Sequence, residues 1–382
     1  MLQFRWSLRC CLIIPGYSRS ITMSKNDPNM RLVSDSFGPI EIPADSYYGP
    51  QTARSMKHFN INRSHDRMPL PIIHSLAMLK EVAADINCKY ARISASHAEA
   101  IKKACQEVYS GQLDKEFPLS IWQTGSGTQS NMNVNEVIAN RANEILNGNR
   151  TDKPQIHPND HVNCGQSSND IFPTAMNVSV ALETAWKVIP ALKTLHSALT
   201  EKTEAFSSIV KIGRTHLQDA VPMTVGQELG AFTTQLRQSI DCIKHSLLSV
   251  CELAVGGTAV GTGLNSTKGF DKQVCLELNN LVKKLFLDLP TAASKHAVDL
   301  EFVPAENKFA ALAGHDTLLQ LSSAFNRTAT VLFKLADDFI LLSSGPGCGF
   351  GELLLPPNEP GSSIMPAQSA FRRKLSDFKK TG

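Results

Sequence analysis

Three long stretches of heptad-like apolar spacing constrain the fold of this 382-residue chain more than any other feature. Within each stretch, apolar residues recur at steps of three, four or seven over roughly 20 residues. The three stripes comprise Val178, Leu182, Ala185, Ile189, Leu192 and Leu199; Leu229, Phe232, Leu236, Ile240, Ile243, Leu247 and Val250; and Leu318, Ser322, Phe325, Ala329, Leu332, Ala336 and Phe339. Such spacing is typical of long, nearly parallel helices. We therefore predict a mainly α fold built on a long-helix bundle, with a kink in the first helix at Pro190.

Apolar residues also lie outside these stripes, at Leu248, Val331 and Leu341. A long helix that is apolar on more than one side is normally buried on more than one side. The pattern therefore predicts that further copies of the chain complete the bundle.

The chain before the bundle has a mixed character. Residues 31–50 contain a short alternating stretch interrupted by proline, which predicts short strands and turns. Helical spacing begins near residue 71. Residues 117–173 are polar and rich in Gly, Ser, Asn and Thr, with one helix-like stretch over residues 134–146. Because a long polar segment inside a compact protein is more often functional than idle, we expect functional residues here.

The formal net charge of +3 comes from the two ends of the chain. Residues 1–30 carry four basic residues against one acidic residue, and residues 367–382 carry five against one. The body between them is therefore mildly acidic, which argues against a domain-wide nucleic-acid-binding surface.

The first 30 residues are cationic, poor in acidic residues and loosely amphipathic. This composition is typical of a mitochondrial transit peptide and predicts import into the matrix. The alternatives are a secretory signal peptide and a disordered leader without a targeting function. Met23 could start a shorter, cytosolic form.

Two further properties limit the class of protein. No apolar run reaches the ~18 residues that a membrane span needs, so we expect no membrane association. The nine cysteines form no C-x-x-C pair and their number is odd. This disfavours a disulfide framework or a zinc site and favours a reducing compartment.

Residues 124–133 combine small hydroxyls, amides and two glycines without any charge. Glycines let backbone N–H groups approach a ligand, and hydroxyls and amides add neutral donors. The segment suits a carboxylate or phosphate, and the alternative is a solvated loop.

Residues 157–170 contain two features. His157 and His161 suggest a metal, but no third ligand has suitable spacing. Residues 167–170 predict the capped start of a helix. Because a helix N-terminus also attracts anions, capping and carboxylate binding are compatible.

His216 lies in a polar segment, residues 213–220, just before a long helical pattern. A lone histidine is commonly a satisfied structural residue, but this one is the best general acid/base candidate in the chain. Residues 361–366 have the composition of a mobile loop. Hydrolase, NTPase and dinucleotide-binding motifs are missing from the sequence.

Together these segments resemble the class II fumarases of the aspartase/fumarase superfamily, from about Arg31 to Pro366. The resemblance is carried, in order, by residues 126–133 (SGTQSNMN), 157–163 (HPNDHVN), 167–170 (SSND), 213–216 (GRTH), 256–263 (GGTAVGTG) and 361–366 (GSSIMP). It implies the reversible hydration of fumarate to (S)-malate in the tricarboxylic acid cycle, without a cofactor or a metal. It also implies a mixed N-terminal lyase domain over residues 31–166 and a central helical-bundle domain over residues 167–366.

The same resemblance assigns roles to residues. The reaction removes a weakly acidic C3 proton and forms an aci-carboxylate, so donors must converge on one substrate carboxylate. By resemblance, Ser362 is the base, and His216 with Thr215 handles the leaving hydroxyl as water. Substrate carboxylates are held by Ser126, Thr128, Ser167, Ser168 and Asn169, and a second carboxylate site comprises His157, Asn159 and Asp160. The family is a homotetramer in which each active site draws residues from three subunits.

The sequence departs from the family pattern after Pro366. The family continues with Gly-Lys-Val-Asn-Pro, whereas residues 367–370 read AQSA, and the basic tail 367–382 resembles nothing in the family. We therefore expect an incomplete bundle domain, no C-terminal domain, and a chain that is inactive or poorly soluble alone. The alternatives are a non-catalytic fumarase-like subunit and another superfamily lyase, such as aspartate ammonia-lyase. His216 and Ser168 favour fumarase, because aspartases usually have Gln and Thr at these positions.

Overall fold

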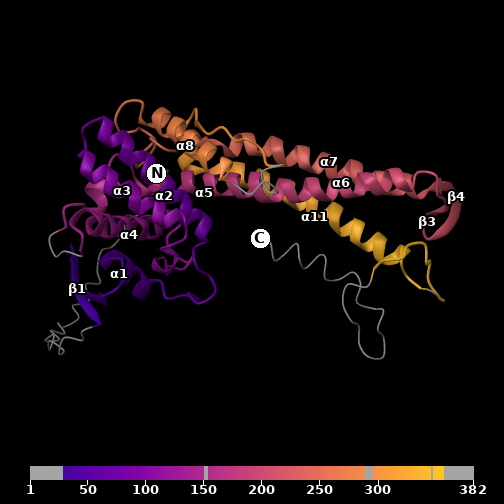
Figure 1. Ribbon diagram of the computed structural model, residues 1–382, viewed down its shortest axis with the longest axis horizontal. Coiled ribbons are helices and arrows are strands. Elements are labelled where there is room, and N and C mark those ends of the chain that lie inside the picture. The colour runs from indigo at the N-terminus through magenta and orange to yellow at the C-terminus, as the bar shows by residue number, and fades with distance from the viewer. Residues whose placement is uncertain (1–28, 150–153, 289–295, 346, 357–382) are drawn as a thin grey trace, which may run out of the picture.

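A head of closely packed helices continues into a long rod of helices in this chain (Figure 1). The computed structural model describes residues 29–149, 154–288, 296–345 and 347–356. The expected transit peptide, the basic tail 367–382 and Ser362 all lie outside the described residues, apart from the last residues of the 1–30 segment.

The head contains short strands and mostly short or medium helices. They are β1 Met30–Asp35, β2 Gly38–Pro43, α1 Pro50–His58, α2 Leu70–Lys89, α3 Ala95–Tyr109, the 3-10 turn η1 Asp114–Glu116, α4 Thr128–Asn147, the π-helical turn η2 Pro158–Val162, α8 Phe270–Leu287 and α10 Lys308–Ala313.

The rod and its connections contain the remaining helices and strands, including the two longest helices, α7 and α11. They are α5 Ser168–Glu183, the π-helical segment η3 Thr184–Val188, α6 Ile189–Ala205, β3 Val210–Thr215, β4 Gln218–Thr224, α7 Val225–Val250, β5 Glu252–Leu253, β6 Val303–Pro304 and α11 Asp316–Leu342. The predicted mainly α, long-helix architecture is confirmed.

The short strands predicted near the N-terminus are also confirmed. β1 and β2 form an antiparallel hairpin, and α1 follows with Pro50 in its first turn. The start of α1 is held by the buried carboxylate of Glu136 on α4, which accepts hydrogen bonds from the backbone N–H groups of Gly49, Gln51 and Thr52. This contact satisfies donors that a helix N-terminus otherwise leaves unpaired and joins the hairpin region to α4.

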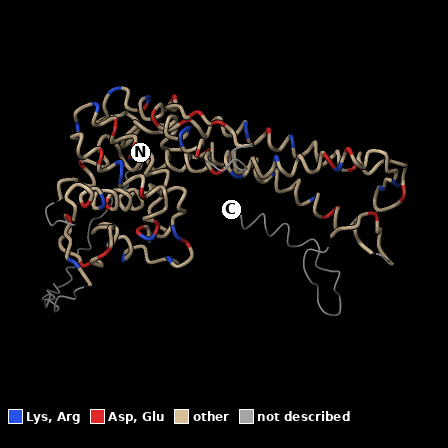
Figure 2. Tube along the Cα trace, viewed as in Figure 1, with Lys and Arg blue, Asp and Glu red and all other residues tan. Residues whose placement is uncertain are grey.

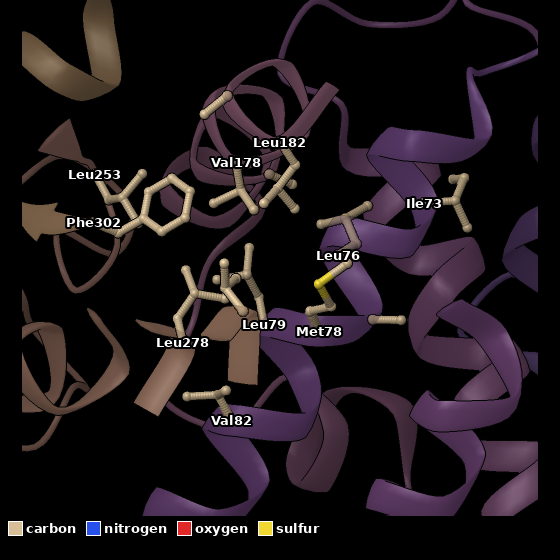
Figure 3. Close-up of a cluster of buried hydrophobic side chains, with 14 of the residues drawn as sticks. Ile73, Leu76, Met78, Leu79, Val82, Val178, Leu182, Leu253, Leu278 and Phe302 are labelled. Carbon is tan, nitrogen blue, oxygen red and sulfur yellow. The ribbon is translucent and has the colours of Figure 1, made fainter. Parts of the chain in front are cut away.

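One continuous hydrophobic core joins the head to the base of the rod (Figure 3). α2 is its centre and packs against α3, α5 and α8. Leu76 and Leu79 of α2 are fully buried, as are Val178 of α5 and Leu278 of α8. Burying an aliphatic side chain of this size contributes about 1.5–3 kcal/mol, so this shared core holds the start of α5 firmly against the head.

The first two apolar stripes are confirmed in full, because every residue of both is buried. α6 and α7 run side by side along the rod (Figure 1). The disturbance predicted at Pro190 takes the form of η3, in which the Ile189 N–H donates to the Thr184 carbonyl five residues earlier. Pro190 then occupies the first turn of α6, where its missing N–H costs nothing.

The third stripe is confirmed in part. Leu318, Phe325, Leu332 and Phe339 pack against the core and Ala336 is buried, whereas Ser322 and Ala329 are exposed. The other buried residues of α11 are Leu321, Ala324, Thr328, Leu335 and Leu342. α11 packs chiefly against α7. Because large apolar side chains of α11 are exposed as well, spacing alone identified the packed face only in part.

The apolar residues outside the stripes, which we expected to be buried by further copies of the chain, are not fully buried within a single chain. Leu248 and Leu341 are exposed, and Val331 is half-buried. Other large apolar side chains of α11, such as Leu319 and Phe333, are exposed as well. Burial by further copies of the chain stays a prediction.

The rod ends in the antiparallel hairpin β3–β4. Thr215 pairs with Gln218, so the turn consists of His216 and Leu217, both with positive φ. The chain after α11 returns to this hairpin, where Glu352 binds Arg214 and also Lys211, at 2.7 Å. This ion-pair cluster fastens residues near 352 to the far end of the rod.

Charged residues of both signs are interspersed along the described chain (Figure 2). None of the helices in the described parts is both long and apolar enough to cross a membrane.

Candidate carboxylate-binding site

The N-terminus of α5 is the organising feature of the candidate site. The Ser167 hydroxyl accepts a hydrogen bond from the Asn169 N–H, and the Asp170 carboxylate accepts one from the Ser167 N–H at 2.9 Å. This reciprocal capping fixes residues 167–170, as predicted. The positive end of the helix dipole at this point favours an anion.

Asp170 also fastens a distant loop to α5. Its carboxylate accepts hydrogen bonds from the backbone N–H groups of Gly256 and Thr258, at 3.0 and 2.9 Å. The Asn169 side chain donates to the Ala259 carbonyl at 2.8 Å. Burial raises the pKa of Asp170 to about 6 despite these hydrogen bonds. The glycine-rich segment 256–263 is thereby held beside the start of α5.

Buried amides connect the same helix start to the head. The side-chain NH₂ group of Asn131, on α4, donates to the Ser168 hydroxyl at 2.9 Å and to the side-chain amide oxygen of Asn163 at 3.3 Å. That Asn163 oxygen also accepts a 2.7 Å hydrogen bond from the ammonium of Lys80, on α2. Burial lowers the pKa of Lys80 to about 7. A cation, two amides and a hydroxyl from four segments therefore form one network behind the start of α5.

Asn163 and Ser168 of this network line a cavity of about 830 Å³. Its polar lining includes Asn159, Asp160, Asn163, Ser167, Ser168 and Thr258. A smaller cavity of about 320 Å³ is lined by Ser126 and Asn169 and shares Ala259 and Val260 with the larger one. The structure thus brings most of the sequence-predicted carboxylate ligands to one region of the head.

Ser126 and Thr128 flank Gly127 at the start of α4. The Ser126 hydroxyl lies 3.0 Å from that of Thr128, so the two form a short hydroxyl chain. Gly127 has φ +66°, and a Cβ at this position would lie 2.2 Å from the ring of Phe172 on α5. Only glycine permits this close approach of α4 to α5. Thr128 itself faces a different cavity, beside α1.

The three residues of the predicted second carboxylate site lie together at η2. The Nδ1 atom of His157 accepts from the N–H groups of Asn159 and Asp160 at 3.3 Å and lies 3.1 Å from the Asp160 carboxylate. Asp160 lines the 830 Å³ cavity, His157 lines a second cavity against the N-terminal hairpin, and Asn159 lines both. The cap therefore gives His157 a structural role in this chain. Among the described residues, no group of three or more His, Cys, Asp or Glu side chains is arranged to hold a metal ion.

Thr215 and His216 do not join this cluster. Both are exposed in the hairpin at the far end of the rod from α4 (Figure 1). The helical run from Ser168 to Ala205 rises ~1.5 Å per residue, which separates the two ends by roughly 55 Å. Within one chain, the predicted acid/base residues and the carboxylate ligands are therefore far apart.

Sequence reasoning missed four residues of this region as site residues: Lys80, Asn131, Asn163 and Asp170. A signal for Lys80 existed, because a lysine in the middle of the apolar helix 70–89 needs a buried partner. The asparagines carry no such signal, since an amide in a polar stretch is usually solvated.

Comparisons with known proteins identify the family of this chain. The sequence matches the lyase family over residues 38–369. The fold is similar to a fumarate lyase:delta crystallin protein from Brucella melitensis, with a TM-score of 0.81 and 36% identity over 92% of this chain and 73% of that one. The chain belongs to the lyase family.

Closer similarity exists to the class II fumarase of Schistosoma mansoni. Its crystal structure matches with a TM-score of 0.88 and 59% identity, over 91% of this chain and 72% of that one. The mitochondrial fumarate hydratase of Danio rerio is 49% identical over 93% of this chain and 66% of its own length. The chain is a member of the class II fumarate hydratases and spans about two thirds of the length of these relatives.

Proposed function

We propose that this chain provides the carboxylate-binding part of a fumarate hydratase site, for the reversible hydration of fumarate to (S)-malate. One observation carries the proposal. Ser167 and Ser168, at the positive end of α5, line the same cavity as Asn163 and the glycine-rich loop. Hydroxyls, amides and helix N–H groups are the donors that a dicarboxylate needs.

The chemistry needs donors more than it needs a strong base. Removal of the C3 proton of malate places a second negative charge on the adjacent carboxylate, and donors positioned there lower the barrier. In this proposal Ser126, Ser167, Ser168 and Asn169 hold the substrate carboxylates. His216 with Thr215 and Ser362 supply the proton transfers, as the family pattern implies. Thr128 joins these carboxylate ligands through the hydroxyl of Ser126, 3.0 Å away.

The separation of Thr215 and His216 from the start of α5 supports a site that is shared between copies of the chain. We propose that the complete site forms in a homotetramer, in which His216 of one copy approaches the α5 start of another. The exposed apolar residues of α11, together with Leu248 of α7, support such an assembly, since exposed apolar patches mark interaction surfaces. Mitochondrial relatives and the cationic first 30 residues support a location in the mitochondrial matrix.

Complementation tests the function without requiring that the chain be active alone. The chain is co-expressed with the Schistosoma mansoni class II fumarase in which the serines corresponding to Ser167 and Ser168 are alanine. Mixed oligomers are purified through a tag on this chain, and malate dehydration is followed by the ultraviolet absorbance of fumarate. We expect turnover to be restored, because this chain contributes intact carboxylate ligands.

Two controls make the result specific. A Ser168→Ala chain should co-purify equally well and restore no turnover, whereas Ser96→Ala, an exposed change on α3, should restore it fully. Co-purification with equal turnover from the Ser168→Ala chain would contradict the proposal.

A further inference from the structure

Lys80 is the largest fully buried side chain of the described protein. It lies in the middle of α2, among the apolar residues that pack this helix against α3 and α5. A buried ammonium is costly unless it is paired. The Lys80 ammonium donates a 2.7 Å hydrogen bond to the side-chain amide oxygen (Oδ1) of Asn163, and Asn163 lines the 830 Å³ cavity.

This hydrogen bond decides what Asn163 presents to the cavity. An amide side chain can turn over and exchange its oxygen for its NH₂ group. Here the oxygen accepts from both Lys80 and Asn131, so the NH₂ group must lie on the other side. One of its hydrogens makes a long, 3.3 Å contact with the Gln166 carbonyl, which leaves donor capacity for an anion.

The charge of Lys80 is not neutralised by a direct carboxylate contact in this network. The titratable groups that act on it are Asp170 of α5 and Cys105 of α3, while α4 and the segment after η2 contribute the neutral amides of Asn131 and Asn163. The Asp170 carboxylate is engaged with three backbone N–H groups. The Lys80 charge therefore adds positive potential behind a cavity that the charged side chains of Arg92 and Asp160 line directly.

We propose that Lys80 is a positioning residue for the carboxylate cavity. Its ammonium holds Asn163 with the amide N–H groups toward the ligand and makes the cavity attractive to an anionic carboxylate. The inference rests on the proposed function, since it assumes that a dicarboxylate occupies this cavity. It assigns Lys80 a role through Asn163 and no contact with the ligand itself.

The test uses Lys80→Met, which keeps length without a donor, and Lys80→Gln, which keeps an N–H donor without charge. Lys89→Met is the matched control, because Lys89 ends the same helix and forms an exposed ion pair with Glu277. Calorimetry measures succinate affinity of the purified chain at about pH 6 and about pH 8. The two values bracket the pKa of Lys80, near 7.

We expect wild type and Lys89→Met to bind more weakly at the higher pH, where Lys80 loses its proton. Lys80→Met should bind about 10- to 100-fold more weakly at the lower pH, the usual range for a charged hydrogen bond. Lys80→Gln should recover part of this loss. The lysine-specific pH dependence should vanish in both variants, which a purely structural role would not produce. Wild-type affinity in a folded Lys80→Met protein would overturn the proposal.

A second measurement separates this inference from the proposed function. The side-chain NH₂ resonances of Asn163, identified by their loss in Asn163→Asp, are recorded through a pH titration. In wild type they should shift with a midpoint near pH 7, and this shift should disappear in Lys80→Met. If succinate fails to bind wild type, the cavity assignment fails, and these resonances alone judge the Lys80–Asn163 coupling. Resonances unaffected by Lys80→Met would overturn it.

Discussion

The Asp170 carboxylate accepts a 2.9 Å hydrogen bond from the backbone N–H of Thr258, 88 residues further along the chain. Thr258 has φ +58°, a strained value for a β-branched residue that persists only when its surroundings impose it. One buried carboxylate thus caps α5 and fixes the loop that forms a wall of the cavity. The capping motif was readable in the sequence, but its second function was not.

Asp170→Asn should destabilise the fold by about 1–3 kcal/mol near neutral pH, because an amide turns an N–H group toward one of three backbone donors. Urea unfolding measures the change. Asp241→Asn, in an exposed ion pair with Arg237, is the control and should change stability by less than about 1 kcal/mol. Equal stability of the two variants would mean that the three hydrogen bonds contribute little.

The pH dependence of the same residue has a definite sign. The folded-state pKa is about 6 and the ordinary value is 3.8. Between these values the folded chain holds a proton that the unfolded chain has lost, so stability falls as pH rises through this interval. In the Asp170→Asn protein, the part of this decrease in stability that comes from the titration of Asp170 should be missing. A curve of unfolding free energy against pH for both proteins provides the check.

Gly127→Ala should destabilise the fold by about 2 kcal/mol or more. The position requires positive φ, and the new methyl group would meet the Phe172 ring at 2.2 Å. Gly125→Ala is a closely matched control, because an added Cβ there meets nothing within 4 Å. Thermal unfolding compares the two variants, and a Gly127→Ala protein as stable as Gly125→Ala would refute the close α4–α5 contact.

Glu352→Gln should loosen the hairpin at the end of the rod. The Arg214 and Lys211 charges outweigh burial and lower the pKa of Glu352, so its stabilisation is present above pH 4.5 and is lost as pH falls below that value. We expect a loss of about 1–3 kcal/mol at about pH 7 and a smaller difference at about pH 3. Hydrogen exchange of β3–β4 measures the local effect, and the exposed Glu306→Gln serves as control. Unchanged exchange at neutral pH would argue against the cluster.

Cysteine reactivity should follow burial. Burial raises the pKa of Cys251 and Cys275 to about 12, so neither forms the reactive thiolate near neutral pH. Among the cysteines that the structure describes, Cys348 is exposed and should react with a thiol reagent first. Peptide mass spectrometry after brief labelling of the native protein gives the order, with urea-unfolded protein as control. Early labelling of Cys275 would indicate local opening of α8.

The relation between prediction and structure varies along the chain. The seams of α5–α6 and α7 were predictable because each helix is buried against others in the same chain, so its apolar period coincides with its packed face. The seam of α11 was predictable only in part, because apolar side chains such as Leu319 and Phe333 are exposed as well. Periodicity records which residues avoid water, not which partner covers them.

The candidate site divides in the same way. The hydroxyl and amide segments, the capped start at Ser167 and the acid/base candidate His216 could be predicted from the sequence, because they depend on local chemistry. Packing was needed to show that Ser168, Asn163 and the loop near Thr258 line one cavity, and that the hairpin carrying His216 lies at the other end of the rod. Lys80 is the clearest case. The helix pattern shows a lysine among apolar residues. Only packing reveals that the side-chain amide oxygen of Asn163 accepts a hydrogen bond from its buried ammonium.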